Sequence, residues 1–368
     1  MRVEYLIIGA GIAGLSTAAR LVLDGAADVL VIDRERQAGF YSSSHNAAIG
    51  RRLTGTAVHT ALTVEGRNLL NDLGLMDSSG GLLLAAAPNG LDSLAEEASR
   101  FGIGMNRFKG SPFADCLAAE TMEIPLDGVI NIDGMLNWCT QTIKSNGASV
   151  RLNTSVHKIQ QLSDGCLVET NDGSINAKAI INAAGGWARD IGFMASALPI
   201  DFKPMRRHLV WSAAQYPSNR PWLWWADRPF YMRPESGGLL MSPLDETEVY
   251  PPQLNNQPVT DPGVLIELAE TLREVAPGIA EYPINRLWCG LRTFSPDRKF
   301  VIGWDPINPR LFWVAGLGGH GMTSGLAVGK LAATLIKTRG FAAEFDPGRF
   351  LSGSQYIRPS LNTRSPVE

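Results

Sequence analysis

The feature that most constrains the fold is a set of three glycines between an apolar segment and a helix-like segment near the N-terminus. Residues 4–35 read "EYLIIGAGIAGLSTAARLVLDGAADVLVIDRE". This pattern predicts a strand over residues 4–8, a helix over 12–24 and a second strand over 28–32. Because a crossover helix joins two parallel strands in a βαβ unit, we expect an α/β fold with a parallel sheet.

Gly9, Gly11 and Gly14 form the pattern G-x-G-x-x-G, which follows the first strand directly and opens the helix. Glycine here permits a tight turn and lets backbone N–H groups approach a pyrophosphate at the helix N-terminus. Asp33 ends the second strand about 20 residues after Gly14, where a carboxylate would hold ribose hydroxyls. The sequence therefore predicts a dinucleotide site rather than a plain glycine turn.

Composition and charge exclude several other classes of protein. The net charge of −3 gives no reason to expect binding to nucleic acid or to an anionic membrane surface. The four cysteines form no C-x-x-C pair, so neither a disulfide framework nor a metal site is indicated, and a cytoplasmic location is the default expectation. Glycines and Arg20 interrupt the apolar stretch 5–23, so we expect no targeting or transmembrane segment there.

The middle of the chain is a series of short alternating segments. Asp-Gly turns at 164–165 and 172–173 separate predicted strands, and a further buried strand is predicted over 178–183. Residues 200–245 also alternate. Four tryptophans lie in this last stretch: Trp211, Trp222, Trp224 and Trp225.

The C-terminal part repeats the opening order of strand, glycine turn and helix. A helix is predicted over 263–275, and another over 322–337, directly after the glycine turn "GGHG" at 318–321. No low-complexity linker separates two halves of the chain. We therefore expect interleaved domains rather than tandem ones.

A hydroxyl-rich loop, "AGFYSSSHNAAIGRRL", follows the second strand, instead of the further parallel strands of a nicotinamide dehydrogenase. The segments "INAAGGWA", "PMRRH", "FYMRP", "GLRTFSPD" and "GGHGMTSG" come later in this order. In these segments the sequence resembles the FAD-dependent D-amino-acid oxidase and glycine oxidase family, and within it the bacterial D-arginine dehydrogenase type. The resemblance covers most of the chain but not residues 76–130.

The resemblance implies an α/β two-domain flavoprotein. A Rossmann-like FAD-binding domain of the glutathione-reductase type would comprise residues 1–75, 135–195 and 285–368. An interleaved mixed-sheet substrate domain would comprise 76–134 and 196–284. The flavin would lie at the junction of the two, where ligand sites commonly form.

The resemblance also implies that FAD is the cofactor, bound noncovalently because no cysteine matches a covalent flavin attachment. The helix after residue 321 would stabilise the reduced, anionic flavin with its N-terminal N–H groups. The residues expected to contact FAD are Gly9, Gly11, Ile12, Ala13, Gly14, Asp33, Arg34, Ser43, Ser44, Asn46, Ala47, Ala48, Ile49, Val156, Ala184, Gly185, Trp187, Arg292, Gly318, Gly319, His320, Gly321, Met322 and Thr323.

Arg292 and Tyr231 are the first candidates for the substrate site. In proteins that this sequence resembles, an arginine in the G-L-R segment and a tyrosine in the F-Y-x-x-P segment hold the substrate carboxylate. A guanidinium grips a carboxylate with two parallel hydrogen bonds, and the phenol adds a third. The alternatives are a structural ion pair of Arg292 with Asp297 or Asp305, and core packing of Tyr231.

Arg207 and His320 are further candidates. The resemblance favours Arg207 over Arg206 as a second carboxylate contact, and strand alternation would send only one of the two inward. A solvated arginine pair is the alternative. His320 could act as a base, although a residue in this turn is more often used for its backbone.

The resemblance implies oxidation of the α C–N bond of a small-molecule amino acid to an imine and then a 2-oxo acid, with oxygen or a quinone as electron acceptor. Ile49 replaces a histidine of the D-arginine type, and "SGGLLLAAAP" offers no acid for a basic side chain. We therefore expect a D-amino acid with an apolar side chain or an N-substituted amino acid. The tryptophans at 211, 222, 224 and 225 suggest an apolar or aromatic pocket wall, with plain core packing as the alternative. The alternatives are a 2-hydroxy acid, which would need His320 as a base, and a noncatalytic FAD-binding assembly protein.

Overall fold

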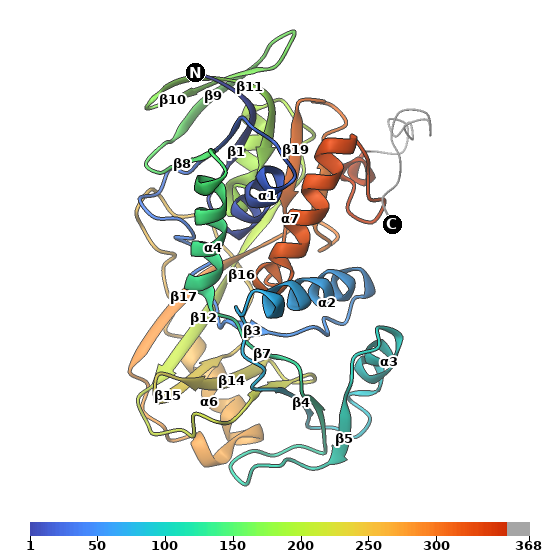
Figure 1. Ribbon diagram of the computed structural model, residues 1–368. Helices are drawn as coiled ribbons and strands as arrows, with labels where there is room; N and C mark the ends of the chain where they lie inside the picture. Colours follow the sequence, from blue (N-terminus) through green and yellow to red (C-terminus); the bar gives the residue numbers. More distant parts are fainter. Residues whose placement is uncertain (352–368) are drawn as a thin grey trace.

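The structure is a computed structural model that describes residues 1–351 of the 368-residue chain. Its strands form two large sheets, which lie one above the other in Figure 1. The combination of a largely parallel sheet, a mixed sheet and flanking helices confirms the predicted α/β class. Within residues 1–351 no helix is both long and apolar enough to span a bilayer.

The upper sheet joins the N-terminal βαβ unit to strands from the middle and the end of the chain. Strands β19, β11, β1, β2 and β8 are parallel in that order, β18 is antiparallel at one edge, and β9 and β10 extend β11 as an antiparallel meander. Among the described residues the sheet has eight strands: β1 (Arg2–Ile8), β2 (Val29–Ile32), β8 (Ser149–Arg151), β9 (Val156–Gln161), β10 (Cys166–Thr170), β11 (Gly173–Asn182), β18 (Val301–Trp304) and β19 (Leu311–Ala315).

Both faces of the central part of the upper sheet are covered, which is why β2 and β19 are apolar throughout. In β1, Ile7 packs against a helical layer, whereas Leu6 and Ile8 pack on the opposite face. The helical layer lies in front of the sheet in Figure 1. It consists of α1 (Ile12–Leu23), α4 (Ile132–Ser145) and α7 (Gly321–Thr338). Helix α5 (Ala188–Met194) lies with the meander on the other face.

The lower sheet is mixed. Its strands β12 and β17 pair antiparallel from Lys203↔Phe294 to Trp211↔Arg286, and they run up from the lower sheet toward the upper one (Figure 1). In the described part of the chain this sheet has nine strands: β4 (Gly81–Ala85), β5 (Asn106–Lys109), β6 (Glu120–Ile124), β12 (Lys203–Ser212), β13 (Trp222–Trp225), β14 (Phe230–Glu235), β15 (Gly238–Ser242), β16 (Thr247–Glu248) and β17 (Arg286–Phe294).

Helix α2 (Ala57–Asp72) crosses between the two sheets and packs on α7. Gly66 makes this approach possible, because a Cβ there would lie 2.0 Å from the carbonyl oxygen of Thr323. The remaining elements are helices α3 (Asp92–Arg100) and α6 (Val264–Val275), the small pair β3 (Ile49–Gly50) and β7 (Gly128–Val129), and the 3-10 turns Gly185–Trp187, Pro277–Ile279 and Pro347–Phe350.

The elements predicted from the sequence agree with the structure to within a few residues. The glycine turn at 318–321 leads into α7, and the Asp-Gly turns at 164–165 and 172–173 join β9, β10 and β11. Strand β17 pairs in the lower sheet, although the range 285–368 placed it in the FAD-binding domain. The division into two domains otherwise stays a prediction.

Candidate active site

A cavity of about 450 Å³ follows the ends of β1, β2 and β11, beside the start of α1. The backbone is packed too closely here for side chains at the key glycines. Gly9 has φ +114°, and a Cβ on it would lie 2.3 Å from the carbonyl oxygen of Ala183. A Cβ on Gly14 would lie 1.9 Å from the carbonyl oxygen of Gly9, so Gly14 lets the helix pack against the strand. The result is a bare backbone cradle at a helix N-terminus, which fits a pyrophosphate.

Asp33 lies at the end of β2, in the wall of this cavity. Its carboxylate accepts hydrogen bonds from the backbone N–H of Ala10 (2.7 Å) and of Glu35 (2.8 Å). Burial raises the pKa of Asp33 despite these bonds. Each oxygen keeps a free lone pair, so the fixed carboxylate can accept further hydrogen bonds, as ribose hydroxyls would require.

The guanidinium of Arg34 stacks on the ring of Trp187 in the wall of the first cavity, and the two form a flat surface. This guanidinium lies 4.0 Å from the ring centroid of Trp187 and donates to the hydroxyl of Tyr41 (3.0 Å) and to the carbonyl of Pro252 (3.0 Å). Burial and the hydrogen bond to Glu35 raise the pKa of Tyr41 to about 12, so this phenol stays protonated. A planar ring system fits beside such a flat surface.

Most residues predicted to contact FAD line this first cavity. They are Gly9, Gly11, Ile12, Ala13, Asp33, Arg34, Ser43, Asn46, Val156, Ala184, Gly185, Trp187, Arg292, Gly318, Gly319, Gly321 and Met322. Five others line only the second cavity, described next: Ala47, Ala48, Ile49, His320 and Thr323. Gly14 and Ser44 line neither cavity.

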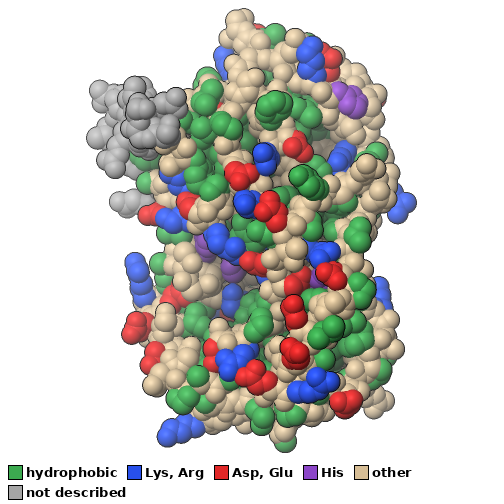
Figure 2. Space-filling view, turned by 180° about the vertical axis from the view of Figure 1, so that it is seen from behind, with side chains coloured by type: hydrophobic (Ala, Val, Ile, Leu, Met, Phe, Trp, Pro, Cys, Tyr) green, Lys and Arg blue, Asp and Glu red, His purple; other side chains and the backbone are tan. Residues whose placement is uncertain are grey.

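The second cavity, of about 680 Å³, adjoins the first. Arg207, Tyr231 and Arg292 belong to the walls of both, so these three side chains mark the junction. Figure 2 shows histidine and basic side chains around a hollow at mid-height of the molecule. The structure therefore brings together the residues predicted for the substrate carboxylate, at the inner end of a polar cavity.

The side chain of Arg292 has no hydrogen bond or ion pair with any other residue among the described 1–351. The proposed alternative partners are engaged elsewhere. Asp297 pairs with Arg349 (2.8 Å), and Asp305 accepts from the indole N–H of Trp313 (2.9 Å). The guanidinium of Arg292 is partly buried and has no carboxylate partner among the described residues, so it can bind an anion from solution.

Tyr231 is 1% exposed, and its hydroxyl has no hydrogen-bond partner among the described residues. Its ring stacks on Trp224, with centroids 4.6 Å apart and an interplanar angle of 29°. A buried hydroxyl without a partner costs about 1–3 kcal/mol, and this cost is relieved when the hydroxyl donates a hydrogen bond to a ligand oxygen. Core packing therefore accounts for the ring of Tyr231 but not for its hydroxyl.

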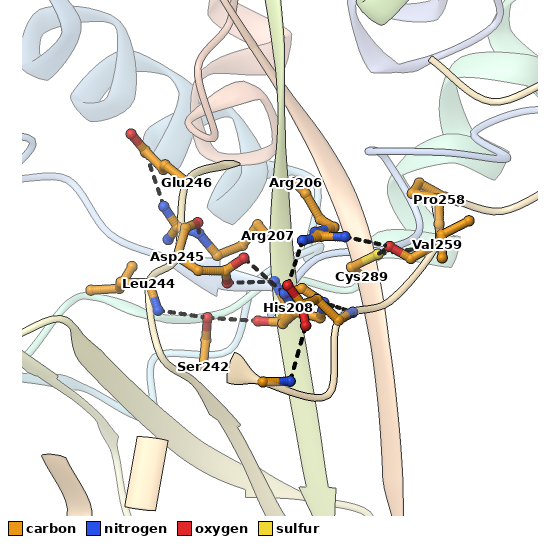
Figure 3. Close-up of polar contacts among 12 residues, drawn as sticks. Arg206, Arg207, His208, Ser242, Leu244, Asp245, Glu246, Pro258, Val259 and Cys289 are labelled. Atoms are coloured by element: carbon orange, nitrogen blue, oxygen red, sulfur yellow. Dashed lines mark hydrogen bonds and ion pairs between the residues drawn. The ribbon is translucent and has the colours of Figure 1, made fainter. Parts of the chain in front are cut away.

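Arg206 and Arg207 point to opposite sides of β12 (Figure 3), as strand alternation requires. Arg206 donates to Val259 and Asp261, whereas Arg207 faces the cavities. Arg207 is opposite Gly290 in β17, and Arg292 stands two residues further along the same face, a diagonal pair. The Nη1 atom of Arg207 is buried and has no hydrogen-bond partner among the described residues. Burial and the charge of Arg292 lower the pKa of the Arg207 guanidinium to about 9.

A hydrogen-bond network behind Arg207 fixes its position (Figure 3). The Nε of Arg207 donates to the carbonyl of Asp245 (2.7 Å), and Nη2 donates to Glu246 (2.9 Å). Asp245 in turn binds Nδ1 of His208 (2.7 Å), and Nε2 of His208 accepts from the N–H of Asp261 (2.9 Å). Sequence reasoning missed this network, because its members are far apart in the chain.

His320 is the N-cap residue of α7 and lines the second cavity. Burial, and then the charge of Arg51, hold the pKa of His320 well below its usual value. The ring of His59 lies 5.9 Å away, and burial lowers the pKa of His59 to about 4. Both imidazoles are therefore neutral near pH 7 and add no positive charge to the cavity.

Arg51 is a cavity residue that sequence reasoning did not single out. Its neighbour Arg52 is buried in an ion pair with Asp127 (2.6 Å), whereas Arg51 lines the second cavity. The guanidinium of Arg51 lies 3.9 Å from the ring centroid of Trp224. The available signal was the "GRR" that follows the hydroxyl-rich loop.

The four tryptophans of residues 200–245 do not form one wall. Trp224 and Trp225 line the second cavity, but Trp222 is fully buried beside β4, and the indole of Trp211 donates to Glu235. None of the four cysteines lines either cavity, and no cluster of potential metal ligands occurs within the described residues. Noncovalent binding of the cofactor stays a prediction.

The fold and the first cavity are those of a dinucleotide-binding protein, and a second cavity lined by arginines adjoins it. The chain belongs to the FAD dependent oxidoreductase family, whose model matches residues 4–335. This confirms the predicted family and FAD as its cofactor. The likeness to the D-arginine dehydrogenase type in particular stays a prediction.

Two relatives illustrate the family. The chain is 26% identical to 4-methylaminobutanoate oxidase (formaldehyde-forming) of Paenarthrobacter nicotinovorans, over 99% of this chain and 47% of that protein. It is 25% identical to the mitochondrial dimethylglycine dehydrogenase of Homo sapiens, over 95% of this chain and 44% of that protein. The chain therefore spans less than half the length of these relatives.

Solved structures support the fold at lower sequence identity. L-proline dehydrogenase from P. horikoshii superposes with a TM-score of 0.82 at 22% identity, covering 95% of this chain and 98% of that one. Glycine oxidase from Geobacillus kaustophilus superposes with a TM-score of 0.78 at 21% identity, covering 97% and 99%. The predicted flavoprotein fold is thus confirmed over nearly the whole length of both structures.

Proposed function

We propose that this protein oxidises the α C–N bond of an amino acid or N-substituted amino acid, with FAD as the oxidant. One observation carries the proposal: within residues 1–351, the side chain of Arg292 and the hydroxyl of Tyr231 have no partner at the junction of the two cavities. The planar guanidinium would hold the substrate carboxylate with two hydrogen bonds, and the phenol would donate a third.

Holding the carboxylate at the junction aligns the α C–H bond with the first cavity, and such alignment is the main requirement of hydride transfer. FAD, when bound, would accept the hydrogen and both electrons of that bond at N5. The lone pair of a neutral substrate nitrogen forms the new C=N bond, and water then hydrolyses the imine to a 2-oxo acid. The N-terminus of α7 and the nearby arginines would stabilise negative charge on the reduced cofactor.

The names of the relatives support the choice of substrate class. 4-Methylaminobutanoate oxidase and dimethylglycine dehydrogenase are both named for amino acids with a methylated nitrogen. An N-substituted amino acid is therefore our preferred substrate. The D configuration and the apolar side chain stay predictions from the sequence, and five arginines in the wall of the second cavity do not favour the latter.

An anaerobic titration of the FAD-loaded protein tests this function. We expect flavin absorbance to bleach with N-alkyl glycines, proline or other amino acids, and readmitted air then tells an oxidase from a quinone-dependent dehydrogenase. If every amine leaves the flavin oxidised while carboxylates still perturb its spectrum, the proposed reaction is wrong. A noncatalytic FAD-binding role would then be favoured.

A 2-hydroxy acid is a second candidate, favoured by the neutral imidazole of His320 in the second cavity. Oxidation of an alcohol needs a base for the hydroxyl proton, and a depressed pKa leaves His320 free to accept it. The same titration with 2-hydroxy acids distinguishes the two candidates, because only the reactive class bleaches the flavin.

A further inference from the structure

The second cavity contains a second arginine without a partner, in addition to Arg292. Within residues 1–351 the guanidinium of Arg51 makes no hydrogen bond and no ion pair. Its contact is with the face of Trp224, at 3.9 Å from the ring centroid. A stacked guanidinium keeps its N–H donors free, because they point outward in the plane of the group.

The carboxylates of the cavity wall are already used by other groups. Glu246 pairs with Arg207 (2.9 Å) and with Arg298 (2.7 Å). Asp227 accepts hydrogen bonds from the backbone N–H of Ala86 (3.0 Å) and Ala87 (2.9 Å) and lies near Arg228. Among the described residues that line the cavity, no carboxylate is therefore left for Arg51 or Arg292.

One substrate carboxylate can neutralise only one of these two arginines. Burial and the charge of Arg292 lower the pKa of Arg51 to about 10, so the guanidinium of Arg51 remains charged near pH 7. The guanidinium groups of Arg51 and Arg292 repel each other in this partly enclosed cavity, and bound anions would offset the repulsion. The second cavity thus has room and charge for a ligand with two separate anionic groups.

We propose that Arg51, stacked on Trp224, is a second anion site, and that the substrate is an amino acid with a second carboxylate. The first carboxylate binds Arg292 and Tyr231, and the second, on the side chain or on the nitrogen substituent, binds Arg51. Trp224 couples the two sites physically, because its ring stacks on Tyr231 as well as on Arg51. This inference rests on the proposed function for the first carboxylate and the reacting bond.

The test uses unreactive probes on the FAD-loaded protein, with flavin absorbance and thermal unfolding as readouts. Glutarate and succinate are compared with butyrate and propionate. We expect the dicarboxylates to bind about 10- to 100-fold more tightly, as one additional charged hydrogen-bonding interaction implies. Arg51→Gln should remove this difference while leaving the Kd of butyrate within about twofold.

Matched variants separate a specific contact from general charge. Arg228→Gln removes the same charge from the same cavity, but its guanidinium already pairs with Glu274 (2.7 Å), so dicarboxylate selectivity should persist. Arg51→Lys keeps the charge and should retain part of the selectivity. Equal binding of di- and monocarboxylates by the unaltered protein, or equal weakening of both in Arg51→Gln, would overturn the proposal.

Reactivity is measured separately, so that the two proposals fail in different ways. If dicarboxylates bind selectively through Arg51 but no amino acid bleaches the flavin, the second anion site stands and the proposed reaction falls. If monocarboxylic amino acids bleach it as well as aspartate, glutamate and N-carboxyalkyl glycines do, the second site falls and the reaction stands. Tighter binding of phosphono or sulfo analogues than of their dicarboxylate counterparts, lost in Arg51→Gln, would replace the second carboxylate by that anion.

Discussion

Gly319 and Arg292 are packed so closely that a Cβ on Gly319 would lie 2.8 Å from Cζ of Arg292. Gly319 has φ +88°, in the turn that leads into α7. The turn that serves the cofactor cavity thus also sets the position of the arginine proposed to hold the substrate. The cofactor cavity and the proposed substrate site therefore meet where the backbone of Gly319 contacts the guanidinium of Arg292.

Gly319→Ala should weaken substrate binding more than it weakens FAD binding. The added methyl group would displace the guanidinium of Arg292, and alanine at this φ costs about 1 kcal/mol or more of folding free energy. We expect KM to rise about tenfold, as a loss of about 1.4 kcal/mol implies. Gly55→Ala, also at positive φ but with nothing within 4 Å, is the control for backbone strain alone. Equal KM values in the two variants would contradict the prediction.

Arg292→Gln should lower kcat/KM by roughly 10²- to 10⁴-fold, since two charged hydrogen bonds to the substrate are lost. The melting temperature should change little, because the side chain of Arg292 has no partner within the described chain. Steady-state kinetics with the best substrate of the titration measure the effect. Arg298→Gln, an exposed arginine of the same cavity, is the matched control and should lower kcat/KM by less than about threefold.

Tyr231→Phe should reduce kcat/KM by about tenfold without loss of stability. The hydroxyl contributes one hydrogen bond to the bound substrate but none to the free protein, so its removal costs nothing on folding. Thermal unfolding without ligand, compared with unfolding in the presence of a carboxylate probe, separates the two effects. A lower melting temperature of the free variant would show that the hydroxyl has a partner in the protein.

His320→Asn should keep near-normal turnover on an amine substrate across pH 6 to 9. The pKa of His320 lies well below its usual value, so protonation of this ring does not limit the rate in that range. If instead a 2-hydroxy acid is the substrate, loss of the base should lower kcat by about 10²- to 10⁴-fold. Single-turnover flavin reduction as a function of pH measures both possibilities directly.

Asp245→Asn should lower the free energy of unfolding at neutral pH but not in acid. Burial alone would raise the pKa of Asp245, but the hydrogen bonds from His208 and the charge of Arg207 outweigh it and lower the pKa. A carboxyl whose pKa is lowered on folding stabilises the protein above its unfolded pKa of about 3.9, and this stabilisation is lost as pH falls through the folded pKa. Urea unfolding of both proteins should therefore show a constant difference from pH 5 to 8 that shrinks below about pH 4. A difference that persists in acid would show that the charge of Asp245 is not the cause.

Much of the fold could be predicted because local patterns determine it. The glycine pattern at 9–14 and the glycine turn at 318–321 each fix a strand, a turn and a helix within about 30 residues. Alternation along β12 likewise predicts that Arg206 and Arg207 point to opposite faces. It does not predict which of the two faces the cavities. Residues 76–130 gave no such signal, since β4, β5 and β6 are stabilised by pairing with each other and with β13.

The composition of the second cavity could not be predicted, because it depends on side chains brought together from distant elements. Arg51 follows β3 of the small β3–β7 pair, and Trp224 belongs to β13 of the lower sheet, so their contact arises only when these two parts of the fold come together. The sequence suggested that the four tryptophans form an aromatic wall of the substrate pocket. In the structure only two of them reach the cavity, and arginines line much of the rest.

The antiparallel pairing of β12 with β17 has a consequence for altering the protein by design. Arg207 and Arg292 are carried by this one pair of strands, so the spacing of their backbone positions is set by the strand pairing. The second anion site, by contrast, is built from the segment after β3 and from β13. Libraries that randomise Arg51 and two further residues of the second cavity, Thr54 and Thr56, should therefore change substrate choice while the strands that carry Arg207 and Arg292 are left unaltered.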